Sequence, residues 1–213
     1  MADGAGDFRA TSKALRQAVR AEKQPLTVET FVWSHGYLRV LADQLDQAHA
    51  RDQGLRLADR VRVCRQAYPD LPIYLLGHSA GCAVVLAAAE VLPPQSLDHI
   101  VLLAPSVPAD YDLRPALRSV KHELDVFCSL RDDWYLRMGF WLLTVTHGRY
   151  ALPAGNAGFR PRLESAEDAR LYQKLCHYPW GPWLAWTGHE GGHFGYQQQG
   201  YLRGFVVPLL AVY

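Results

Sequence analysis

The sequence predicts an α/β fold, a three-layer α/β/α sandwich around a mostly parallel sheet of about five or six strands. Short apolar runs of strand length alternate with segments whose apolar residues recur every three or four positions, a pattern typical of parallel strands joined by helices. The chain has 213 residues, 49% of them hydrophobic and 20% charged, which is enough for one domain with a sizeable core. We therefore expect a single domain over residues 1–213.

Five segments have the apolar composition and the length of strands: residues 26–33, 73–76, 99–103, 124–130 and 183–187. Between the first two, one apolar helical face runs from Leu38 to Ala48 and another from Leu57 to Tyr68, so two helices are expected there. Residues 80–92 are apolar on nearly every side, as expected of a helix buried against the centre of a sheet. A last amphipathic helix spans residues 202–210, with a kink expected at Pro208.

Two regions stand outside this alternation. Residues 1–25 are expected to form an N-terminal extension or helix. Residues 132–181 contain clustered glycines, prolines and aromatic side chains, and we interpret them as an insertion that contributes to the substrate pocket. The alternative, given equal weight, is that these rings fill a second small core.

Residues 77–81, Gly-His-Ser-Ala-Gly, match the pattern Gly-x-Ser-x-Gly. They follow an apolar strand and open an apolar helix, the context in which this pattern marks a nucleophilic serine on a sharp strand-to-helix turn. The glycines leave room for neighbouring backbone, and free N–H groups at the helix start favour negative charge near Ser79. Ser79 is therefore the candidate nucleophile. His78 occupies a variable position and is expected to pack or to form a local hydrogen bond.

A His-Gly turn at His35 and Gly36 ends the first predicted strand. Together with the turn at Ser79, it makes the chain resemble the α/β-hydrolase superfamily, in a reduced form similar in length to the small lipase-like and cutinase-like members. The resemblance runs from residue 26 to the C-terminus. It implies an oxyanion hole formed by the N–H groups of Tyr37 and Ala80. A simple β-to-α turn is the alternative at His35 and Gly36.

The family order of serine, acid and histidine directs attention to acidic residues that follow a strand. We prefer Asp132, because the family commonly has a small residue closing this strand, here Ser129, and an acid three positions later. Asp133 is the alternate, since either member of the pair could instead cap a helix starting near Trp134. A loop after the preceding strand offers Asp110.

The histidine is expected after the last strand, where His189 and His193 both occur. Gly-Gly-His-Phe resembles the family's small-small-His-apolar pattern, so His193 is preferred and His189 is the alternate. Two histidines four apart on a helix can bind zinc, but the glycines between these two disfavour a regular helical turn. We predict no metal and no cofactor for the protein.

The resemblance implies a serine hydrolase that cleaves an acyl bond, for which a carboxylester is preferred, through a Ser-His-Asp triad and an acyl-enzyme. An acyltransferase with the same triad and a non-catalytic ligand-binding module are the alternatives. The expected partner is a small, apolar acyl substrate, because a net charge of +1 gives no argument for nucleic acid. No apolar run approaches the ~20 residues of a membrane-spanning helix. Four cysteines without paired spacing and the absence of a signal-peptide pattern predict a cytoplasmic protein.

Overall fold

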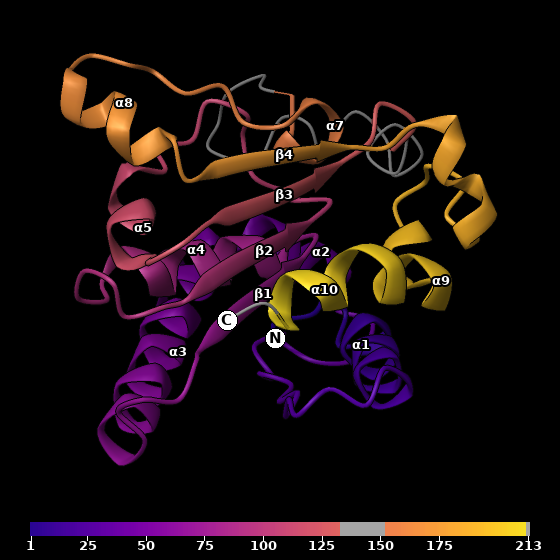
Figure 1. Cartoon of the computed structure of the whole chain (residues 1–213), viewed down its shortest axis with the longest axis horizontal. Coiled ribbons are helices and arrows are strands. Elements are labelled where there is room, and N and C mark those ends of the chain that lie inside the picture. The colour runs from indigo at the N-terminus through magenta and orange to yellow at the C-terminus, as the bar shows by residue number, and fades with distance from the viewer. Residues whose placement is uncertain (133–151, 212–213) are drawn as a thin grey trace.

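The computed structural model describes residues 1–132 and 152–211. Within these residues, four parallel strands, fewer than the five or six expected, form one sheet in the order β1-β2-β3-β4 (Figure 1), with bounds Tyr74–His78, His99–Leu103, Leu124–Cys128 and Leu175–Pro179. The first three match predicted strands. The fourth lies within residues 132–181, where no strand was expected, and residues 183–187 belong to a 3-10 helix, η2 (Pro182–Thr187), instead of a strand.

The prediction of a strand over residues 26–33 is wrong in detail, because the N-terminus takes the place beside β1. Ala2 donates its N–H to Leu76 O at 2.8 Å, and its own carbonyl accepts the N–H of His78 at 3.0 Å. Phe31 forms an isolated β-bridge to Ala2, on the side of Ala2 that faces away from β1. Residues 26–33 are thus one position further from β1 than the sequence suggested.

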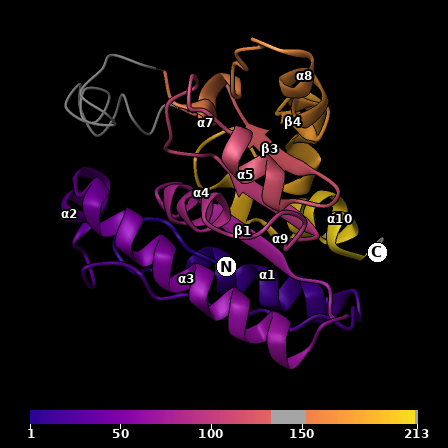
Figure 2. The same cartoon turned by 90° about the vertical axis from the view of Figure 1, so that its left-hand side faces the viewer.

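Helices cover both faces of the sheet, giving the expected three-layer α/β/α sandwich. Because successive strand residues point to opposite faces, the strands contribute side chains to two hydrophobic cores, one on each face of the sheet. One core contains Leu75, Ile100, Leu102 and Val126 and is covered by α3 (Gln47–Ala67), α4 (Gly81–Glu90) and α5 (Arg114–Ser119). The other contains Leu76, Val101, Leu103 and Phe127 and is covered by α1 (Ala10–Ala21) and the C-terminal helices. In Figure 2, α4 lies between α3 and the sheet.

The helical predictions agree closely with the structure. The two helices expected between residues 38 and 68 are α2 (Val40–Leu45) and α3. The C-terminal helix is divided into α9 (Gln199–Tyr201), a π-helical segment η4 (Leu202–Val206) and α10 (Val207–Ala211), so its irregular part ends just before Pro208. Shorter elements are α7 (Ala154–Ala157), α8 (Ala166–Tyr172) and η3 (Gly195–Gln197). Among the helices of residues 1–132 and 152–211, none has the length and apolar character needed to cross a bilayer.

Candidate active site

Ser79 lies on the sharp turn between β1 and α4. Its backbone has φ +53°, a left-handed conformation that is unfavourable for a residue with a side chain. The N–H of Ser79 donates to Leu103 O at 2.9 Å, which holds the turn against β2. The glycines on either side are needed for space. A Cβ on Gly77 would lie 2.7 Å from Cys82 Cα, and one on Gly81 would collide with the carbonyl oxygens of residues 2 and 3.

Asp132 and His193, which are 61 positions apart, meet beside this turn. His193 Nδ1 lies 2.8 Å from Asp132 Oδ2, and both side chains are buried. Because Asp132 engages Nδ1, Nε2 is the ring nitrogen left for a proton exchange with a substrate or a serine. His193 and Ser79 both line one pocket. This arrangement brings the three preferred residues of the predicted triad to one place.

The two alternates fare differently. His189 is fully buried, and its Nδ1 accepts the N–H of Gly191 at 2.9 Å. Its ring packs against Tyr196 and Tyr201, and burial lowers its pKa to about 4. His189 therefore occupies the protein core as a neutral side chain and does not line the pocket. Asp133 lies outside the described residues.

His78 packs directly beside the candidate base. Its ring centroid is 5.1 Å from that of His193, and its Nε2 lies 3.3 Å from the carbonyl oxygen of His193. Burial, and then the proximity of His193, lower the pKa of His78 to about 3. A neutral His78 can donate Nε2–H to that carbonyl, so it packs and forms a hydrogen bond, but with a residue 115 positions away and not with a local partner as expected.

The structure places the N-terminal loop, and not the His-Gly turn, against Ser79. Gly4 approaches so closely that an added Cβ would lie 3.3 Å from Ser79 Cβ. The backbone N–H groups of Gly4 and Ala5 form no hydrogen bond with any described residue, and the same holds for Ala80 just after Ser79. Tyr37, by contrast, has a side chain that is 69% exposed and is absent from the pocket lining.

The His-Gly turn instead supports this loop. Asp43 accepts the N–H of His35 at 2.8 Å through Oδ1 and the N–H of Gly6 at 2.7 Å through Oδ2, so one carboxylate ties the turn to the loop. Burial alone would raise the pKa of Asp43, but hydrogen bonds from Gly6, Ser34 and His35 outweigh it and lower that pKa. Asp43 therefore stays ionised and holds Gly6 in place.

Ser106 is a polar neighbour of Ser79 that the sequence analysis missed. Its Oγ lies 3.1 Å from Ser79 Oγ, and its N–H donates to Ser79 O at 3.2 Å. It follows β2 after Ala104, whose φ of +46° marks a second strained turn at the same edge of the sheet. No sequence motif predicted a role for Ser106, because the loops after β1 and β2 come together only through the parallel pairing of these two strands.

The pocket has a volume of about 370 Å³. Phe8, Val40 and Phe194 give it apolar walls. Asp3 contributes a buried carboxylate oxygen, Oδ2, that makes no hydrogen bond with the described residues, while the guanidinium of Arg9, another lining residue, is paired with Asp7. In the part of the chain that the structure describes, the residues grouped closely enough to hold a metal ion lie at a different edge of the sheet.

Comparisons with known proteins agree with this architecture. Residues 41–130 match a family model described as the alpha/beta hydrolase fold. A crystal structure of a protein of the alpha/beta hydrolase superfamily from Xanthomonas campestris pv. campestris superposes with a TM-score of 0.50 at 17% identity, covering 99% of this chain and 96% of that one. No curated protein matches the chain. With the parallel sheet and the strained turn at Ser79, these findings show that the chain has the α/β-hydrolase fold.

Proposed function

We propose that the chain is a serine hydrolase that cleaves a carboxylester or a related acyl bond, with Ser79 as nucleophile, His193 as base and Asp132 as orienting acid. The contact between His193 Nδ1 and Asp132 Oδ2 at 2.8 Å, beside a pocket shared by His193 and Ser79, is the observation that carries this proposal. A carboxylate on Nδ1 selects the tautomer in which Nε2 can take a proton, and it stabilises the imidazolium that forms.

The reaction then proceeds through an acyl-enzyme. Ser79 Oγ attacks the acyl carbonyl carbon while His193 Nε2 takes the hydroxyl proton, and the same proton goes to the leaving alkoxide as the C–O bond breaks. Water attacks the acyl-enzyme with His193 again as base, which releases the acid and restores Ser79. The N–H of Ala80, with the N–H of Gly4 or Ala5, would bind the oxyanion in each half, and each such donor is worth about 10² to 10³ in rate.

The pocket favours a compact, mainly apolar acyl group. Phe8, Val40 and Phe194 supply apolar contact, and 370 Å³ is at the small end of ligand pockets. Asp3 gives the same space a buried carboxylate that can orient a polar part of the substrate. We further propose a single domain, an insertion at residues 132–181 and a cytoplasmic location, the last supported by four free cysteines.

The test is a fluorophosphonate probe followed by peptide mapping. The probe should modify Ser79 alone, and Ser79→Ala should abolish the modification. Ser106→Ala is the matched control, because it removes the hydroxyl beside Ser79 and should leave labelling at Ser79 in place. Modification of Ser106 in the wild-type protein would overturn the assignment.

The base and the acid are separated by single variants assayed on a panel of p-nitrophenyl esters. His193→Ala should lower turnover by about 10⁶, whereas His189→Ala, a core change, should act mainly on stability. Asp132→Asn should lower turnover by about 10⁴ while the fold is kept. Equal kinetic losses for the two histidine variants, after correction for folded protein, would contradict the choice of His193.

An acyltransferase with the same triad is the second candidate. Its acyl-enzyme would react with an alcohol or amine in place of water. Adding small alcohols to the ester assay distinguishes the two, because a transferase forms the new ester in preference to the free acid. A folded wild-type protein that neither reacts with the probe nor hydrolyses any ester would favour a non-catalytic binding module.

A further inference from the structure

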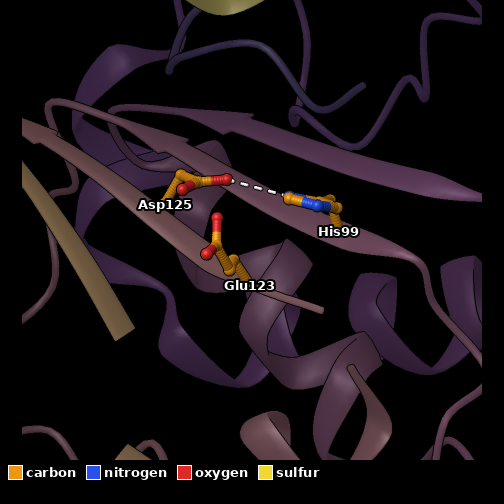
Figure 3. Close-up of side chains that lie close together, drawn as sticks. All are labelled: His99, Glu123 and Asp125. Atoms are coloured by element: carbon orange, nitrogen blue, oxygen red, sulfur yellow. Dashed lines mark hydrogen bonds and ion pairs between the residues drawn. The ribbon is translucent and has the colours of Figure 1, made fainter. Parts of the chain in front are cut away.

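A second cluster of polar side chains lies at the amino ends of the strands, the edge opposite the Ser79 turn. His99 is the first residue of β2, Asp125 is the second residue of β3, and Glu123 immediately precedes β3. One donor atom from each lies within 4.8 Å of the others. Figure 3 shows His99 and Asp125 facing each other, with Glu123 pointing toward the space between them.

Burial makes this cluster unusual. His99 and Asp125 are 1% and 0% exposed, and His99 Nδ1 lies 3.0 Å from Asp125 Oδ2. The other oxygen, Asp125 Oδ1, is enclosed and has no hydrogen-bond partner at normal distance and angle among the described residues, although the Tyr178 hydroxyl on β4 lies near enough to interact with this carboxylate. A buried carboxylate oxygen without a donor costs free energy unless a cation or a hydrogen bond compensates it. The lack of a close donor at this enclosed oxygen therefore favours a bound ligand near Asp125.

The charges around the cluster call for a cation. Asp125 has His99 as its ion-pair partner, and within residues 1–132 and 152–211 no lysine or arginine forms an ion pair with Asp125 or Glu123. Cys176, on the neighbouring strand β4, is paired in register with Asp125.

The donor set suits a divalent transition metal. One imidazole nitrogen with two carboxylate oxygens is a combination that zinc accepts, with a fourth position open to water. Glu123 and His122 are only partly buried, so an ion can reach the cluster from solvent.

We propose that His99, Glu123 and Asp125 form a structural site for a divalent transition metal ion such as zinc, separate from the catalytic pocket. The ion would join the amino ends of β2 and β3 and neutralise the buried carboxylate. It would stabilise the folded protein, since an ion that binds only the native state raises the unfolding temperature. It takes no part in the acyl chemistry, so the proposal does not depend on the proposed function.

The test measures zinc binding by the chelator-stripped full chain. After addition of Zn²⁺ and removal of the excess, native mass spectrometry should show one ion per chain, and the unfolding temperature should rise. Glu123→Gln and Asp125→Asn should each weaken zinc affinity by about 100-fold or more and abolish the temperature rise. Glu167→Gln, an exposed acid on α8, is the matched control and should bind zinc like the wild type. His193→Gln should also keep the site, because it alters only the catalytic pocket.

Two results would overturn the proposal. If the wild type retains no zinc and shows no temperature shift, the cluster is a metal-free pair of His99 and Asp125. If Glu123→Gln and Asp125→Asn bind zinc normally while His193→Gln does not, the ion belongs to the catalytic pocket. If Asp125→Asn fails to fold, the zinc affinity of Glu123→Gln decides the outcome, because Glu123 is only partly buried and its replacement should leave the fold intact.

Discussion

Replacing Gly81 by alanine tests the position of the N-terminal strand and its catalytic consequence in one experiment. Gly81 begins α4, two residues after Ser79, and the backbone of Ala2 and Asp3 passes over it. A Cβ on Gly81 would lie against the carbonyl oxygens of Ala2 and Asp3 at well under 3.0 Å, a separation that real Cβ atoms do not show. One of the two segments must therefore move.

The loss of stability expected for Gly81→Ala follows from the contacts that hold the N-terminal residues beside β1 and α4. The carbonyl of Ala2 accepts the N–H of His78 at 3.0 Å, so the strand cannot retreat without weakening that hydrogen bond. Overpacking costs about 1–3 kcal/mol, and a lost hydrogen bond adds about 1 kcal/mol. A total of about 2–4 kcal/mol should lower the unfolding temperature by roughly 5–15 °C for a chain of this size. If the loop carrying Gly4 and Ala5 supplies an oxyanion donor, turnover of folded protein should also fall by about 10² or more.

The assay combines thermal unfolding with ester turnover at a temperature where the variant is fully folded. Gly204→Ala is the control, since a Cβ there meets nothing within 4 Å, and a helical alanine should be neutral or stabilising by up to about 1 kcal/mol. A Gly81→Ala protein as stable and as active as the wild type would refute the placement of residues 1–3 beside β1. Lower stability with unchanged turnover would keep that placement and reject the loop as an oxyanion donor.

Three further outcomes are expected. Burial lowers the pKa of His78 to about 3 and that of His189 to about 4, so the unfolded chain binds protons that the folded chain excludes. The free energy of unfolding, measured in urea, should be highest above about pH 6.5 and should fall by at most roughly 3 kcal/mol per histidine as the pH drops to about 4. A free energy of unfolding that does not change over this pH range would contradict the burial of these histidines as neutral groups. Ser106→Ala should lower turnover about tenfold, the equivalent of one hydrogen bond to Ser79 Oγ, and an unchanged rate would make Ser106 a packing residue only. Leu102→Ala, at a fully buried position, should cost about 2–5 kcal/mol in thermal unfolding, whereas Leu130→Ala, 84% exposed, should stay within about 0.5 kcal/mol, and equal losses would argue against the described core.

Local pattern was sufficient for much of this protein. The strand-turn-helix around Ser79 was predicted from residues 73–92, because a glycine-flanked turn between an apolar strand and an apolar helix depends on near neighbours alone. The helices α3 and α4 and the strand β2 were found for the same reason, since their apolar periodicity states which face is buried. Family order then directed attention to Asp132 and His193, which the structure places in contact.

Tertiary structure alone decided which segment lies next to β1. Ala2 sits in a stretch too short and too polar to show a strand pattern, and its pairing with Leu76 and His78 is a contact across more than seventy residues. The same long-range pairing placed the loop of Gly4 and Ala5, and not Tyr37, beside Ser79, and the parallel pairing of β1 with β2 brought Ser106 there. Periodicity in a sequence reports which side of an element is apolar, but not which other element covers it. Neighbours in a parallel sheet are set by the summed burial of both faces, a quantity that exists only once the chain has folded.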